Sequence, residues 1–291
     1  MDTLDTATMR AIVEAQRNEI TEHHIYTKLA DATRDPANRE VLRRIGADEL
    51  RHSRFWQEIT GREVKPRVLK VWWYYLIARV MGLTFGVKLM ERGEEGAQVN
   101  YARIAEVIPG AADIAADEND HEQELVAMID EERLKYVGAM VLGLNDALVE
   151  LTGALAGLTL AFGKANIIAV AGLITGISAS LSMAASEYLA TKSEGGELSP
   201  GKAALTTGLA YVFTVAILVA PYFVFARLYL CLGVMLFDAV FVILIFTFYV
   251  SVAQDVPFWR RFAEMAIISL GIAAISFGIG ALVQRFLPID V

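Results

Sequence analysis

Cysteine and histidine are scarce in this chain of 291 residues. The single cysteine, Cys231, lies in an apolar run, so no disulfide can form within the chain. The absence of any C-x-x-C pair also excludes the usual cysteine-ligated zinc or iron sites. All four histidines fall within the first 121 residues, which confines histidine chemistry to the N-terminal half.

Positive charge is also in short supply, because the formal net charge is −8 at pH 7. A chain without a basic stripe cannot neutralise the phosphates of a nucleic acid, so no nucleic-acid partner is expected. The N-terminus is polar and acidic and lacks the basic and apolar regions of a signal peptide. The first domain is therefore expected to stay in the cytoplasm.

Charges of either sign become rare after residue 135. Residues 1–135 hold 25 of the 34 acids and 19 of the 26 bases, which leaves nine and seven for residues 136–291. A membrane-spanning helix needs about 20 apolar residues. The uncharged runs predict five spans, at about 137–162, 166–190, 203–225, 228–252 and 264–285. We therefore expect an all-α protein with a helical domain over residues 1–133 and a membrane domain over residues 134–291.

The charges that flank these spans predict their orientation. Six cations would face the cytoplasm if the N-terminus lies inside: Arg133, Lys135, Lys192, Lys202, Arg260 and Arg261. Three would face outward: Lys164, Arg227 and Arg285. Cytoplasmic loops carry the excess of Lys and Arg, so we expect a multi-pass protein of the cytoplasmic membrane with its C-terminus outside.

Two copies of a Glu-x-x-His motif lie in the N-terminal domain, which has helical patterns over about 6–32, 36–60, 83–107 and 111–136. One copy is Glu49 with His52, and the other is Glu118 with His121. A spacing of three places both side chains on one helix face. When the first and third helices are aligned on their tyrosines, Glu19 matches Glu94, which indicates a duplicated two-helix unit.

This set of six residues predicts a di-metal site inside a four-helix bundle. In such sites two helices each give a Glu and two others each give a Glu-x-x-His. Four carboxylates and two imidazoles suit iron or manganese. The neighbouring residues are read either as additional or supporting metal positions or as solvated, ion-paired residues: Glu22, His23, Glu91, Glu95 and Glu122.

On this pattern, residues 1–133 resemble the rubrerythrin branch of the ferritin-like superfamily without its rubredoxin domain. The resemblance implies a ferritin-like four-helix bundle with a di-iron site. The apolar segment 71–90 is read as an interfacial or dimer-packing crossover. A span there would place the two halves of the metal site on opposite sides of the membrane.

Polar residues inside the predicted spans are expensive in lipid and usually face an interior path. The first span has Asn145, Asp146 and Glu150, and the second has Met183 and Glu187 four residues apart. Carboxylate oxygens with a thioether sulfur favour a transition metal, and protonation of the carboxylates would release it. Asp238 in the fourth span is read either as part of the path or as a cap for a neighbouring helix.

Residues 137–291 resemble the vacuolar iron transporter family. The phrases NDALVELTGALAGLTLAF and GLITGISASLSMAASEYLATKSE carry the resemblance. It implies a homodimer with a ferrous-ion path between the subunits and proton antiport, with key positions at Asp146 and Met183. The loop at 193–202 is short where plant-type members have a long metal-binding insert. The layout of the whole chain is similar to the membrane-bound ferritins of prokaryotes, which implies iron export.

Two functional hypotheses follow from these patterns. The first is a proton-coupled exporter of ferrous iron, with manganese as an alternative substrate, in which the cytoplasmic domain captures or senses the metal. The second is a membrane-anchored di-iron ferroxidase or peroxidase in which the spans serve as an anchor. No catalytic residue is singled out, so enzymatic activity stays open.

Overall fold

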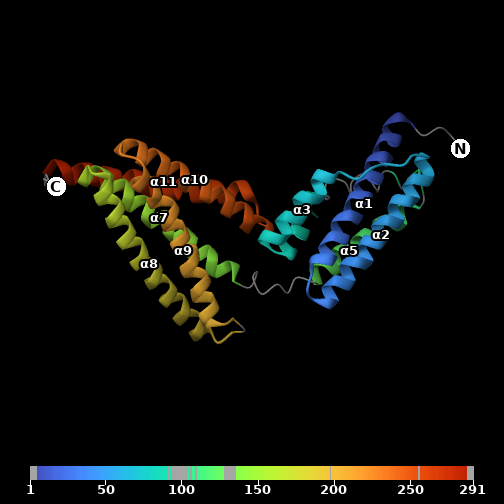
Figure 1. The fold of residues 1–291 in the computed structure, drawn as a ribbon, viewed down its shortest axis with the longest axis horizontal. Helices are drawn as coiled ribbons and strands as arrows, with labels where there is room; N and C mark the ends of the chain where they lie inside the picture. The colour runs from blue at the N-terminus through green and yellow to red at the C-terminus, as the bar shows by residue number, and fades with distance from the viewer. Residues whose placement is uncertain are drawn as a thin grey trace. The chain divides into compact units, whose positions relative to one another are not determined.

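The computed structural model describes residues 5–90, 92–93, 104, 107–108, 110–127, 136–196, 198–254 and 256–286. These residues form helices joined by turns and contain no strand, which confirms the all-α prediction. The chain divides into two compact units, Met1–Glu131 and Glu132–Val291, whose helices Figure 1 labels.

The N-terminal unit is built on α1 (Thr6–Ala32) and α2 (Pro36–Thr60), which pack against each other along their length (Figure 1). Both helices begin at an aspartate whose side chain accepts a hydrogen bond from a backbone N–H of the first turn. Pro36 fits the start of α2, and Gly61, at φ 63°, ends that helix in the left-handed conformation.

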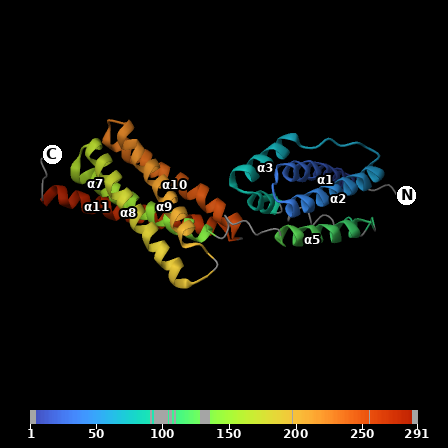
Figure 2. The same cartoon turned by 60° about the horizontal axis from the view of Figure 1, so that its bottom comes forward.

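The N-terminal unit also contains the helices α3 (Val68–Met81) and α5 (Ala111–Ala127). Figure 2 shows α5 running beside α2, with α3 on the other side of α1. Of the helix expected over 83–107, residues 83–90 are helical and most of the remainder lies outside the described residues. The helix expected over 111–136 is described as α5, up to Ala127.

The apolar segment 71–90 is not one continuous helix. The 14-residue α3 ends at Gly82, whose φ of 109° is accessible mainly to glycine. At 1.5 Å per residue α3 is about 21 Å long, which is short of the roughly 30 Å hydrocarbon core of a bilayer. The helix α3 alone is thus too short to span a bilayer, and the reading of segment 71–90 as an interfacial or dimer-packing crossover stays a prediction.

Two apolar clusters in the N-terminal unit leave a polar layer between them. One cluster contains Ile25 and Ile45, and the other contains Ile12 and Trp56. Because Glu19 lies between Ile12 and Ile25 along α1, it is held in the interior with apolar packing above and below it.

The described residues of the membrane unit form five helices that are long and apolar enough to cross a bilayer, which agrees with the predicted number of spans. They are α7 (Val137–Phe162), α8 (Ala165–Glu194), α9 (Pro200–Val224), α10 (Leu228–Ala253) and α11 (Phe258–Phe286). Helix α11 begins six residues before the predicted span, because the helix continues through charged residues that a hydropathy scan excludes.

Small residues set how closely the membrane helices pack. A Cβ atom placed on Gly280 of α11 would collide with the backbone oxygen of Gly157 on α7. On the α9 side, a Cβ on Gly143 would lie 2.6 Å from the backbone oxygen of Thr207. The glycines of α7 therefore allow two neighbouring helices to approach its backbone directly.

Candidate metal centre

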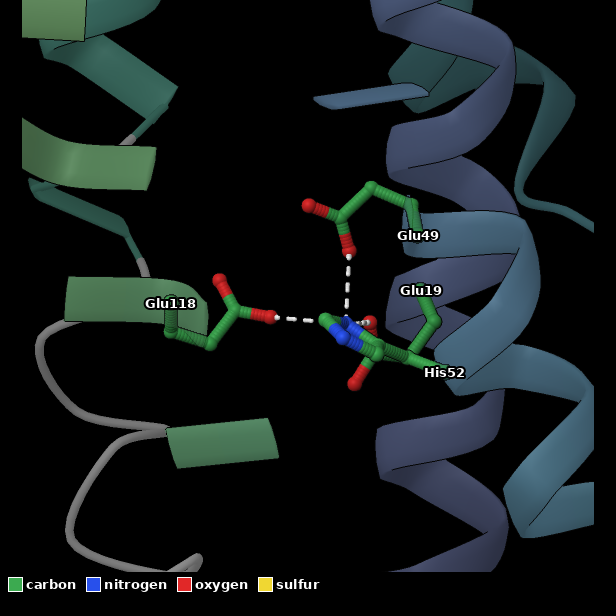
Figure 3. A group of neighbouring side chains, drawn as sticks. All are labelled: Glu19, Glu49, His52 and Glu118. Carbon is green, nitrogen blue, oxygen red and sulfur yellow. Dashed lines mark ion pairs between the residues drawn. The ribbon is translucent and has the colours of Figure 1, made fainter. Parts of the chain in front are cut away.

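Four metal-ligating side chains gather in the polar layer of the N-terminal unit (Figure 3). Glu19 comes from α1, Glu49 and His52 come from α2, and Glu118 comes from α5. One ligand atom from each lies within 4.8 Å of the others. Glu118 reaches His52 from a helix on the other side of the centre from the two helices that carry Glu19, Glu49 and His52, so three helices contribute to one centre.

His52 sits at the middle of this group. Its Nδ1 atom lies 3.4 Å from Glu118 Oε1, 3.5 Å from Glu19 Oε2 and 3.8 Å from Glu49 Oε2. The imidazole is almost fully buried. A single ring nitrogen therefore faces three carboxylates in a space that excludes most water.

His121 of α5 extends the centre on its other side. Its Nδ1 lies 3.3 Å from Glu49 Oε1 and 4.0 Å from Glu118 Oε2. The rings of His52 and His121 stack with their centroids 5.9 Å apart. Glu49 and Glu118 thus each contact both imidazoles, so both carboxylates could help to hold a metal here.

The structure brings together five of the six side chains that the two motifs predict as metal ligands. Glu94, the sixth, lies outside the described residues, as do Glu91 and Glu95. The side chain of Glu122 is also outside the described part of the chain.

The carboxylates and imidazoles of this centre shift one another's protonation. The pKa of Glu19 is raised to about 7, mainly by burial and also by the neighbouring carboxylate of Glu49, while His52 opposes the shift. Burial lowers the pKa of His52 and of His121, but nearby carboxylates more than offset it. The pKa of His52 is raised above its ordinary value, and that of His121 is raised to about 9.

These pKa shifts have a common cause, which is the negative charge of several carboxylates buried together. Three carboxylates in a buried layer need their negative charge reduced or compensated, and the raised pKa values favour protonated imidazoles, which are cationic, and a protonated carboxyl, which is neutral. A divalent cation would supply the same charge without the protons.

A second observation, the lack of hydrogen-bond partners for three buried atoms, also indicates that these side chains could hold a metal ion. Glu49 Oε2, His52 Nδ1 and His121 Nδ1 are buried and make no well-formed hydrogen bond within the described residues. Buried polar atoms in native proteins are normally hydrogen-bonded, so three such atoms within this cluster fit a partner that the protein itself does not supply, such as a metal ion. Carboxylate oxygens with imidazole nitrogens suit iron or manganese.

An outer ring of contacts that the sequence reasoning missed holds both imidazoles. His52 Nε2 lies 3.0 Å from Asp117 Oδ2, and His121 Nε2 lies 3.3 Å from Asp48 Oδ2. Each aspartate directly precedes the glutamate of one motif and contacts the histidine of the other. Such contacts fix ring orientation and keep Nδ1 turned toward the centre.

Arg51 ties the two aspartates together. Its guanidinium donates to Asp48 at 2.5 Å and to Asp117 at 2.7 Å. The sequence held a signal for this ring, because both motifs read Asp-Glu-x-x-His. On the inner side, Trp56 Nε1 donates to Glu19 Oε1 at 3.2 Å and fixes that carboxylate.

The neighbouring candidates on α1 have other contacts. Glu22 is buried and forms an ion pair with Lys70 at 3.6 Å, and His23 Nδ1 lies 2.5 Å from the backbone oxygen of Gly46. Neither belongs to the four-residue group that could hold a metal.

The polar residues of the membrane unit are arranged differently. Glu150 accepts a hydrogen bond from the buried hydroxyl of Tyr211 on α9 at 2.9 Å, and Glu187 accepts one from Thr191 at 3.2 Å. Asn145, Asp146, Met183 and Asp238 are half-buried. Within the described part of this unit no hydrogen bond or ion pair links the acids of α7 to α8, and no group of three metal ligands forms.

Comparison with known proteins identifies a family match for one part of the chain. A search of curated proteins with the whole chain finds no match. Residues 137–197, which include α7 and α8, match the VIT family, in agreement with the resemblance that these residues show. The chain is a multi-pass membrane protein with five candidate spans, and its first two spans match the VIT family.

Proposed function

We propose that the protein exports ferrous iron, with manganese as a second substrate, and that its N-terminal unit captures the same metal in the cytoplasm. The VIT-family match of α7 and α8 carries the transport part of this proposal. The buried carboxylate and imidazole cluster supports the capture part, because its donor set suits these two metals.

The proposed path uses Asp146 and Glu150 of α7 with Met183 and Glu187 of α8. Glu150 is exposed on the single chain, although it lies within a candidate span. Polar residues in the middle of α8 are exposed in the same way, namely Thr175, Ser178, Ser182 and Ser186. Polar side chains are costly against lipid, so their exposure supports a homodimer in which the second subunit covers them.

Proton coupling follows from the chemistry of the proposed ligands. A carboxylate binds a cation only after it has lost its proton, so a path lined by Asp146 and Glu150 exchanges protons for metal. With the N-terminus inside, an inward flow of protons would accompany outward movement of the cation.

The cluster of the N-terminal unit also favours a second candidate function. A buried pair of metal ions held by carboxylates and imidazoles can react with O₂ or peroxide when iron is bound. The alternative is therefore a membrane-anchored ferroxidase or peroxidase. In that case the VIT-like spans would carry no metal flux.

Proton flux in proteoliposomes tests the proposal. The full-length protein is reconstituted under anaerobic conditions, and internal pH is followed after addition of Fe²⁺ or Mn²⁺. We expect metal-stimulated proton flux that Asp146→Ala abolishes and that Ser193→Ala, at the exposed end of α8, preserves. Absence of flux with both metals, in a protein that still binds them, would overturn transport and favour the oxidase.

A further inference from the structure

The outer face of α3 is apolar and exposed, although the helix packs on α1 along its other face. Val71 and Ala78 are buried, whereas Leu69 is 85% exposed and Trp73 is 60% exposed. Five of the exposed large side chains form one set, which we call the α3 stripe: Leu69, Trp72, Trp73, Leu76 and Val80. Val68, at the first position of the helix, is also exposed but lies to one side of the stripe.

The members of the α3 stripe lie on a single helix face. Their spacing of three or four residues, with Trp72 and Trp73 adjacent at the centre, follows the helical period. At 3.6 residues per turn, Lys70 falls on one edge of the stripe and Arg79 on the other. The helix contains no Asp or Glu between Val68 and Met81.

Further positive charge lies beside the stripe. Lys28 of α1 places its Nζ atom 4.0 Å above the ring of Trp72 and 5.4 Å from the ring of Tyr75. The stripe is therefore a band of apolar and indole side chains with cations along its margins.

We propose that the α3 stripe rests on the surface of an anionic lipid bilayer. Helices that lie in the interface present Trp and Leu on one face and place Lys and Arg beside it. Tryptophan favours the level of the lipid headgroups, and anionic headgroups attract basic residues near the surface. Because the same chain carries five candidate spans, a bilayer is always within reach.

The charges of α3 favour lipid over a second copy of this chain. If two α3 stripes packed on each other, Arg79 of both copies would border one interface, and no acidic residue of α3 would be present to pair with either arginine. Lys70 already forms an ion pair with Glu22 of its own chain. Interfaces of proteins are instead complementary in charge. An anionic lipid surface provides that complement.

Spin-label accessibility distinguishes the possible environments of the stripe. In a full-length Cys231→Ser background, Leu76→Cys carries a nitroxide, and Glu58→Cys on the exposed face of α2 is the matched control. The protein is placed in nanodiscs of phosphatidylcholine and phosphatidylglycerol. Relaxation by O₂, which concentrates in lipid, is compared with relaxation by a water-soluble nickel chelate.

We expect the ratio of O₂ to nickel accessibility to be severalfold higher at position 76 than at position 58. Arg79→Gln should lower the ratio at position 76, and Arg54→Gln should leave it unchanged. High nickel accessibility at position 76 would mean that the stripe faces water and would overturn the proposal. Low accessibility to both reagents would identify a protein contact, such as a second copy, and would overturn it equally.

This inference does not rest on metal transport, because neither the cluster nor the path takes part in lipid contact. A protein that moves no metal but shows the lipid signature at position 76 would refute the proposed function and leave this inference standing.

Discussion

The N-terminal unit and the membrane unit hold their acidic residues in opposite ways. In the first, Glu19, Glu49 and Glu118 come from three helices and converge around His52 inside a single chain. In the second, Glu150 is exposed and contacts Tyr211, and no described contact joins it to the acids of α8. The acids of the first unit form one cluster within the chain, whereas those of α7 and α8 do not meet within the described residues of a single chain.

This difference indicates which parts of the molecule enclose the acidic residues of each unit. The cluster is enclosed by apolar layers of its own unit, so its ligand geometry is a property of the fold. The membrane helices pack through glycines and expose polar residues outward, as expected if a path forms between subunits. Substitutions should therefore disturb metal binding in the first unit and helix packing or transport in the second.

The largest effect is expected from Glu49→Gln. Glu49 contacts both imidazoles, so neutralising it should weaken metal binding to the N-terminal unit by at least about 100-fold, the upper end of what supporting residues cost. Isothermal titration of the full-length protein with Mn²⁺ measures this loss. Glu58→Gln, on the exposed face of the same helix, should bind like the wild type.

Gly280→Ala should destabilise the membrane unit by about 1–3 kcal/mol, the usual cost of overpacking. The new methyl group would meet the backbone of Gly157, which cannot move aside as a flexible side chain can. Thermal unfolding in detergent gives the change. Gly278→Ala is the control, since no described atom lies within 4 Å of that Cβ. Equal melting temperatures for the two variants would contradict the close α7–α11 contact.

Arg51→Gln should lower metal affinity about tenfold, because the aspartates that orient both imidazoles would lose their common partner. Arg44→Gln removes another ion pair between α2 and α5, with Glu124, without touching either imidazole. Co²⁺ absorption reports ligand geometry as well as affinity. If both variants change the spectrum and the affinity equally, Arg51 has no positioning role.

The smallest effect is a pH dependence of the metal-free protein. Glu19 has a folded pKa of about 7 against 4.5, and His121 has about 9 against 6.5. Both folded pKa values are raised, so the folded state binds more protons and stability falls as pH rises. The fall should extend from about pH 4.5 to 9, and bound Mn²⁺ should reduce it. Thermal melts followed by tryptophan fluorescence across this range provide the measurement. Stability that rises over the range would contradict these shifts.

Much of the fold could be predicted because its signals are local. Asp5, Asp35 with Pro36, and Gly61 mark the ends of α1 and α2, and both helices begin and end as predicted. The start of α11 was missed because Arg260, Arg261 and Glu264 ended the apolar run. Hydropathy locates the part of a helix that lies in lipid, whereas backbone hydrogen bonding continues beyond it.

Only those features of the metal centre that follow from residue spacing within one helix could be predicted from the sequence. Motif spacing placed Glu49 with His52 and Glu118 with His121 on common faces, and the structure brings them together. The ring of Asp48, Arg51 and Asp117 depends on which histidine each aspartate meets across two helices. Helical spacing along one chain segment does not specify that pairing, so it emerged only from the packed structure.

An anaerobic titration of the full-length protein with Fe²⁺, read by Mössbauer spectroscopy, tests the central claim most directly. The claim is that the buried acids of the N-terminal unit are there to hold a pair of divalent ions. The account predicts two equivalents bound per chain in similar nitrogen and oxygen environments, both lost in Glu49→Gln. Absence of binding, or binding that Glu49→Gln leaves unchanged, would contradict it.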